Sequence, residues 1–266
     1  NNKLAGISEN SAGLAAYGEN TLTIGGEGSL VAEGDYSGVF VSKNGFLVTG
    51  GTITSTGDYL GIYCNDITVS GGDIEIAGKG GLCCKGVANI NDGDIHITTE
   101  QSDAFLCDAL NMTGGNISID SKRFGIGATG EANILGGTLN IQCVITGISV
   151  HGDDNLTIGG DAKVTIESNR VGIWVWSDAE EPFNCNLIFN GGMLNINCGN
   201  EMFGVDGDIY VAPTSGTQVV VSVGDDANHL TTLDGAVFTE ETIISPDLVN
   251  ESRYVSMSTV GVPASN

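Results

Sequence analysis

The chain has 266 residues, of which 41 are Gly and only 4 are Pro, and its formal net charge at neutral pH is −24. Such a negative surface repels phosphate groups, which argues against nucleic-acid binding, and no apolar run is long enough to insert into a membrane. The seven Cys are an odd number in a chain of this length, so a disulfide scaffold of the small-secreted-domain kind is not expected.

One pattern repeats along the chain as far as about residue 207. A glycine doublet recurs at intervals in the low twenties, and a second glycine or alanine follows each doublet within the repeat. The doublet positions are Gly25-Gly26, Gly50-Gly51, Gly71-Gly72, Asp92-Gly93, Gly114-Gly115, Gly136-Gly137, Gly159-Gly160 and Gly191-Gly192. Both halves of each repeat alternate apolar and polar residues, which is typical of strands, and glycine suits the corners between them.

A short repeat made only of strands and corners predicts a solenoid. We therefore predict an all-β fold for residues 1–207, a single-stranded right-handed parallel β-helix of about eight to nine coils. Residues 177–185 lengthen one repeat and should form a projecting loop. Residues 208–266 lose the repeat but keep strand-like segments, and we expect them to form a β cap, because an open solenoid end would expose unpaired backbone and core.

Stacking of the coils predicts two inward columns of side chains. The first column is Val39, Ile62, Leu82, Phe105, Ile126, Ile148 and Ile173. The second is Val41, Cys64, Cys84, Cys107, Ala128, Val150 and Val175. We expect the three cysteines to be buried free thiols. A disulfide between neighbouring coils is the alternative, but parallel side chains in register rarely meet disulfide geometry.

Acidic and amide side chains gather at one corner of successive coils. Asp73, Asp94 and Asn116 each follow a doublet, and Asp92 lies within one. Oxygen ligands of this kind suit Ca²⁺, which would also relieve repulsion between the carboxylates. A solvated acidic corner without metal is the alternative interpretation.

Aromatic side chains recur on an outward-facing line. The outward positions between the two inward columns are Phe40, Tyr63, Cys83, Leu106, Gly127, Ser149 and Trp174, and Trp176 follows on the same face. Flat rings along a rod can stack on sugar rings, so Tyr63, Trp174 and Trp176 are candidates for carbohydrate binding. Alternatively, the loop at 177–185 or another subunit covers this face.

Catalytic signals are weak. The chain contains no GxSxG elbow, HExxH helix or phosphate-binding loop. His151 stands beside Asp153 and Asp154, but in a Gly- and Asp-rich stretch typical of a surface turn. A lyase would need a basic group near carboxylates, and Lys122 with Arg123 is the pair available.

The repeat, a glycine doublet followed by Asp, Asn or Thr with Ile-x-Ile and then by Gly-Ile-x-Val or Cys, resembles the bacterial carbohydrate-binding β-helix family with clostridial members that bind cellulose and pectate-like polysaccharides. The resemblance covers residues 22–205. It implies a secreted or cell-surface, non-catalytic module that binds plant or microbial polysaccharide with the assistance of calcium. We expect targeting and anchoring segments to lie outside this sequence. The alternatives are a structural stalk or adhesin module and a pectate-lyase-like polysaccharide lyase.

Overall fold

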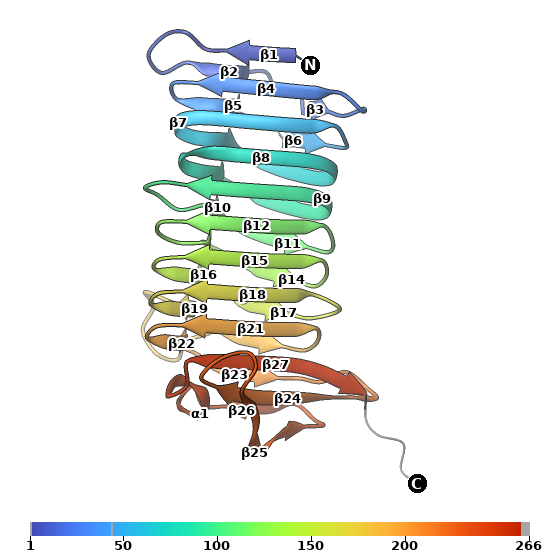
Figure 1. Ribbon diagram of the computed structural model, residues 1–266, viewed down its shortest axis with the longest axis vertical. Coiled ribbons are helices and arrows are strands. Elements are labelled where there is room, and N and C mark those ends of the chain that lie inside the picture. The colour runs from blue at the N-terminus through green and yellow to red at the C-terminus, as the bar shows by residue number, and fades with distance from the viewer. Residues whose placement is uncertain (1, 44, 262–266) are drawn as a thin grey trace.

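The computed structural model describes residues 2–43 and 45–261 and is an all-β parallel solenoid of about nine turns, as predicted (Figure 1). Each turn contributes one strand segment to each of three stacks of parallel strands, which form the three faces of the solenoid. We name them the polar, aromatic and asparagine faces after the outward side chains described below.

The three faces are built from the following strands. The polar face, turned toward the viewer in Figure 1, consists of β1 (Asn2–Ala5), β4 (Ser29–Gly34), β12 (Asn116–Ser121), β15 (Thr138–Cys143), β18 (Lys163–Ser168) and β21 (Met193–Cys198), with parts of β7 (Thr52–Cys64), β8 (Asp66–Cys84) and β9 (Val87–Thr99). The aromatic face consists of β2 (Ala12–Ala16), β5 (Ser37–Val41), β10 (Phe105–Cys107), β13 (Ile126–Ala128), β16 (Thr146–His151), β19 (Val171–Trp176) and β22 (Glu201–Val205), with the C-terminal parts of β7 and β8. The asparagine face consists of β3 (Leu22–Ile24), β6 (Gly45–Val48), β11 (Ala109–Met112), β14 (Ala132–Ile134), β17 (Leu156–Ile158), β20 (Leu187–Phe189) and β23 (Ile209–Val211), with the N-terminal parts of β8 and β9.

The core is a stack of aliphatic side chains in vertical register. Ile126 of β13 is the backbone partner of Phe105 in the preceding turn and of Ile148 in the following turn, and all three side chains are fully buried. Every member of both predicted inward columns is buried, which confirms the predicted register. Cys64, Cys84 and Cys107 are buried with a free thiol, as predicted. Burial raises the pKa of the Cys107 thiol well above its usual value, so this thiol acts as a small apolar group.

The corners depend on glycine at the second doublet position. Gly137 has φ +78°, and a Cβ there would collide with the carbonyl oxygen of Gly115 in the preceding coil. Glycine is required at such a position both for the positive φ and for the close approach of two backbones.

The C-terminal residues close the last turn. They form β24 (Thr217–Gly224), β25 (Leu230–Phe238), β26 (Thr242–Ile244), the short helix α1 (Asp247–Asn250) and β27 (Tyr254–Gly261). Strand β27 pairs antiparallel with β21, and β26 pairs antiparallel with β23. The outer edge of β22, the last strand of the aromatic face, is hydrogen-bonded by Asn250. The Asn250 Oδ1 accepts hydrogen bonds from the backbone N–H groups of Met202 and Phe203, each at 3.0 Å. Each strand of the final turn therefore has hydrogen-bond partners beyond it, as a solenoid end requires.

Replacing Ile126 by Asp should unfold the solenoid. The substitution places an unpaired charge in a continuous core, at a cost of several kcal/mol out of a typical total stability of roughly 5–15 kcal/mol. Thermal unfolding followed by circular dichroism measures the effect, with the exposed Ser118→Asp of the same coil as control. Native stability of Ile126→Asp would show that the inward column is misassigned.

Replacing Gly137 by Ala should destabilise the protein clearly more than Gly28→Ala. Gly28 has no positive φ, and a Cβ there meets no atom within 4 Å, so it reports the ordinary effect of adding a methyl group. We expect about 1–3 kcal/mol for the strained position. Denaturant unfolding of both variants measures the difference, and equal midpoints would contradict a requirement for glycine at this corner.

Candidate functional site

The outward line of the aromatic face is continuous. Phe40, Tyr63, Cys83, Leu106, Gly127, Ser149, Trp174 and Gly204 are successive backbone partners across eight turns. The register therefore places Tyr63 and Trp174 on one face, five coils apart, as the sequence predicts. At about 4.8 Å per coil the separation along the axis is about 24 Å.

An aromatic cluster occupies the N-terminal part of this face. Phe40 and Tyr63 stack with ring centres 5.0 Å apart and an interplanar angle of 7°, and Tyr36 stacks on Tyr59 at 5.6 Å. Tyr17 lies 5.6 Å from Phe40 at a tilt of 44°. A shallow hollow of about 360 Å³ lies among Tyr17, Tyr36, Phe40 and Tyr63. Because rings in a ladder cover each other's faces, the free ring surfaces of this cluster lie at its ends and along its edges.

Charge and ionisation within this cluster favour neutral hydroxyl groups. Burial raises the pKa of Tyr36, and the neighbouring Tyr63 and Tyr59 raise it further, so its hydroxyl keeps its proton well above neutral pH. The Lys85 ammonium lies 5.5 Å from the centre of the Tyr63 ring, within cation–π distance. The cluster thus offers hydroxyl donors and acceptors beside apolar ring surface.

The two tryptophans form a second platform. Trp174 and Trp176 stack at 5.3 Å with an angle of 27°, and Trp176 lies 3.8 Å from the ring of His151 in the preceding coil. The Nε1–H of Trp176 donates to Ser149 Oγ at 3.4 Å, and His151 Nε2 lies 3.1 Å from Asp178 Oδ2. Trp176 is half-buried by these contacts, while Trp174 keeps 38% of its surface exposed. Trp176 is therefore fixed in place, and Trp174 is available to a ligand.

A hollow of about 390 Å³ lies beside this second platform, toward the N-terminal cluster. It is open because the outward side chains of two successive coils are small, Gly127 and Ser149. Leu106 and Phe124 line it on one side and His151 and Trp176 on the other. Aromatic and aliphatic walls with a few polar groups are typical of small-molecule and sugar sites.

Asp103 is one of two carboxylates, with Asp108, that line this hollow. Burial raises its pKa, which the guanidinium of Arg123, with Nε 3.9 Å from Oδ1, partly opposes. Lys122 is drawn instead to Asp120, at 3.2 Å. Lys122 and Arg123 thus each face one carboxylate, rather than a pair of carboxylates across a cleft.

The loop after β19 lies beside the tryptophans. Residues 177–186 form no helix or strand, and the Ser177 hydroxyl donates to Asp153 Oδ1 at 2.7 Å. Asp178 contacts His151, yet Trp174 stays exposed. The loop therefore borders this platform without covering Trp174.

The predicted metal ligands lie at successive corners of the polar face. Asp73, Asp94 and Asn116 are backbone partners in neighbouring coils, and the Asn116 amide donates to Asp94 Oδ1 at 2.7 Å. Asp92 Oδ1 accepts from the backbone N–H of Gly93 at 2.8 Å. Within residues 2–43 and 45–261, no three His, Cys, Asp or Glu side chains converge closely enough to hold a metal ion. Calcium binding here stays a prediction.

Sequence reasoning overlooked part of the aromatic face. Tyr36 and Tyr59 each precede the second glycine mark of their repeats by two residues, so aligning the repeats would have stacked them. Tyr17 belongs to the first coil, where the doublet signal is missing. The pairing of His151 with Trp176 follows from register, as both occupy the same position of adjacent coils.

The fold and this face define a class: a rigid parallel solenoid that presents aromatic platforms and adjoining hollows along one side. A family model described as carbohydrate-binding domain-containing protein matches residues 2–207, and the chain belongs to that family. No curated protein and no solved structure matches the chain. In the described residues, no helix has the length and hydrophobicity needed to cross a membrane.

Proposed function

We propose that this protein is a non-catalytic module that binds a plant or microbial polysaccharide along the aromatic face. The observation that carries the proposal is the exposed Trp174 on one continuous face with a tyrosine and phenylalanine cluster and two hollows. A polysaccharide is an extended chain of rings with apolar C–H faces and hydroxyl edges. Two platforms about 24 Å apart would contact such a chain at separate points and hold it parallel to the solenoid axis.

The charge of the protein supports a neutral glycan over an acidic one. The formal net charge is −24, and the hollow next to Trp176 is lined by two carboxylates, Asp103 and Asp108, and by one cation, Lys85. A uronic-acid polymer would be repelled unless cations bridged the two, whereas neutral hydroxyl groups can donate to these carboxylates. Since such polysaccharides occur outside cells, we also propose a secreted or cell-surface location.

Replacing Trp174 by Ala should weaken binding to insoluble cellulose by about tenfold, because loss of one stacking platform costs on the order of 1 kcal/mol or more. Tyr210→Ala, a half-buried aromatic residue of the asparagine face, is the matched control. Binding isotherms from pull-down measure the affinity, and thermal unfolding checks that both variants fold. Equal affinity of Trp174→Ala and wild type would argue for a stalk or adhesin role of this face.

Calcium is proposed as an assisting ion for acidic glycans, at the corner that holds Asp73, Asp92, Asp94 and Asn116. Isothermal titration of Ca²⁺ into chelator-treated protein should give binding heat that Asp94→Asn loses and the distant Glu131→Gln keeps. Retention on pectate gel should then require the ion, since Ca²⁺ offsets the repulsion between carboxylates. Absence of heat would remove calcium from the proposal and leave neutral-glycan binding to be decided by the Trp174 variant.

A further inference from the structure

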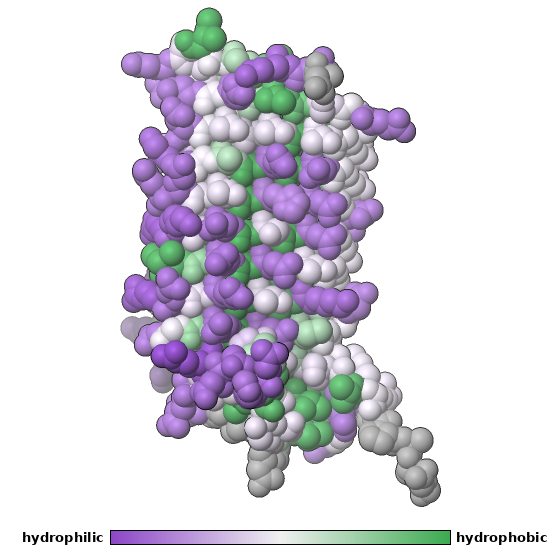
Figure 2. Space-filling model, in the orientation of Figure 1, coloured by the Kyte–Doolittle hydropathy of each residue, from purple (hydrophilic) through white to green (hydrophobic). Residues whose placement is uncertain are grey.

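A second elongated hollow crosses a different face of the solenoid. On the polar face, about 360 Å³ of open space lies over β9, β12, β15 and β18, and about 410 Å³ more continues over β18 and β21 to Arg253 beside the cap. The two share Gln142 and Glu167, so they form one depression, here called the polar trough. Figure 2 shows that hydrophilic side chains cover much of this face with a narrow apolar strip between them.

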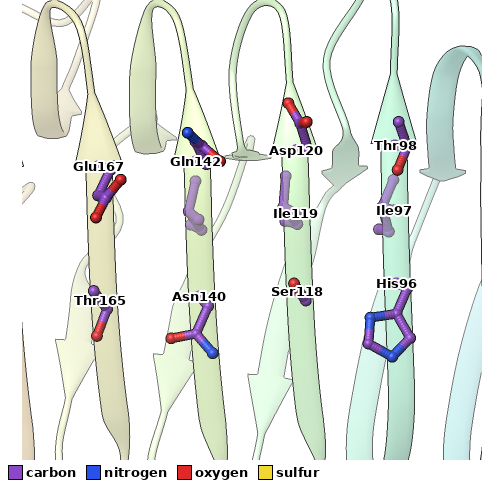
Figure 3. Close-up of a pocket in the computed structure, with 11 residues that line it drawn as sticks. His96, Ile97, Thr98, Ser118, Ile119, Asp120, Asn140, Gln142, Thr165 and Glu167 are labelled. Atoms are coloured by element: carbon purple, nitrogen blue, oxygen red, sulfur yellow. The ribbon is translucent and has the colours of Figure 1, made fainter.

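Two rows of polar side chains in unbroken register run through the polar trough and continue onto the cap strand β27. One row is His96, Ser118, Asn140, Thr165, Asn195 and Ser256. The other is Thr98, Asp120, Gln142, Glu167, Asn197 and Tyr254. Figure 3 shows four members of each row, with Ile97 and Ile119 between the rows. The rows run for about 24 Å across six strands and stand about 7 Å apart, a shape that fits a single extended chain.

Most of the hydrogen-bonding capacity of these rows is unused within the protein. On the asparagine face, by contrast, the Asn111 amide donates to Asn89 at 3.2 Å and the Asn133 amide donates to Asn111 at 3.3 Å, so those side chains satisfy one another. In the described part of the chain, Asn140 and Gln142 have no such partner. The Asn140 and Gln142 amides, which both donate and accept, therefore face outward with unused hydrogen-bonding capacity.

The chemistry of the polar trough selects a neutral, hydroxyl-rich ligand. Asp120 and Glu167 accept hydrogen bonds only, and their charges are balanced by Lys122, which lies 3.2 Å from Asp120, and by Arg253 at the cap end. The trough therefore has no excess charge that would attract an ionic chain. Asp120 and Glu167 are two strands apart with Gln142 between them, too far to share one cation. Tyr254, the half-buried partner of Asn197 on β27, continues the second row onto the cap. Amide, hydroxyl and carboxylate groups are the set that recognises sugar hydroxyls.

We infer that the polar trough is a second glycan-binding site, for a neutral polysaccharide chain, separate from the aromatic face. The inference rests on the proposed function in that both sites take the same class of ligand. Because the two sites lie on different faces of one rigid solenoid, a single molecule can hold two chains at once. The module would then crosslink polysaccharide as well as bind it.

The test is calorimetric titration of the whole chain with two soluble probes, cellohexaose and xylohexaose. Wild type should bind about two oligosaccharides per chain. Trp174→Ala and the double variant Asn140→Ala/Gln142→Ala should each bind about one with the remaining site unchanged, and a variant with all three changes should lose binding at least tenfold at both sites. Thr23→Ala, an exposed polar residue of the asparagine face, should behave as wild type.

The outcomes separate the two proposals. If Asn140→Ala/Gln142→Ala leaves affinity and stoichiometry unchanged while Trp174→Ala removes binding, the polar trough is not a site and the aromatic face stands. If the double variant alone removes binding, the aromatic proposal is wrong and the polar trough is the site. If neither probe binds wild type, both proposals are overturned.

Crosslinking has its own measurement. Protein loaded on insoluble cellulose and washed should capture a fluorescent soluble glucan, and either set of substitutions should reduce the capture at least tenfold. Full capture by both variants would mean that the second chain is not held by these two faces together.

Discussion

The constraint on which this structure depends is the vertical register of its coils. Each backbone N–H and C=O of one turn pairs with the turns beside it, so a residue has an equivalent residue about 4.8 Å above and below. Inside, this register turns Phe105, Ile126 and Ile148 into one continuous stack. Extra residues between two corners cannot fit within the register and must project from the solenoid as a loop. Residues 177–186 are accommodated in this way.

The same register determines the outer surface, because a residue type repeated at one position of successive coils forms a continuous row of that side chain. Asparagines repeated on one face satisfy one another as a ladder. Aromatic rings repeated on another face stack, as Phe40 does on Tyr63. Where the series is broken by small residues, as at Gly127 and Ser149, the Leu106 side chain leans over the glycine but a hollow remains. Recognition surfaces therefore arise from the order of large and small residues along the axis, with no need for a separate domain.

The fold could be predicted from the sequence because the glycine doublets mark the register directly. Once the register is known, the inward columns and the outward line through Tyr63 and Trp174 follow by counting. The contacts between side chains could not be predicted in the same way. Whether Asn116 donates to Asp94 or both turn toward a cation depends on rotamers, and so does the stacking of His151 on Trp176. The sequence predicted that strands after residue 208 would cap the solenoid, but not how they would pair. Asn250, which accepts a hydrogen bond from the backbone of β22, lies outside the repeat, so the register says nothing about it.

The rigid rod shape explains how two weak binding sites on different faces would give a higher combined affinity for a polysaccharide network than either site alone. Under the two-site proposal, each face alone would contact a glycan through shallow, exposed groups, for which weak affinity is expected. Once one face of the rigid solenoid has bound a polysaccharide chain, the other face is held close to neighbouring chains of the same network. The effective concentration of those chains is then set by the spacing between chains and not by free diffusion. The high negative charge favours such an arrangement, since it keeps the rods from associating with one another while leaving neutral chains free to approach. Under the two-site proposal, a surface that repels its own copies and accepts uncharged, hydroxyl-rich chains on two faces would suit a protein that links the chains of a polysaccharide matrix.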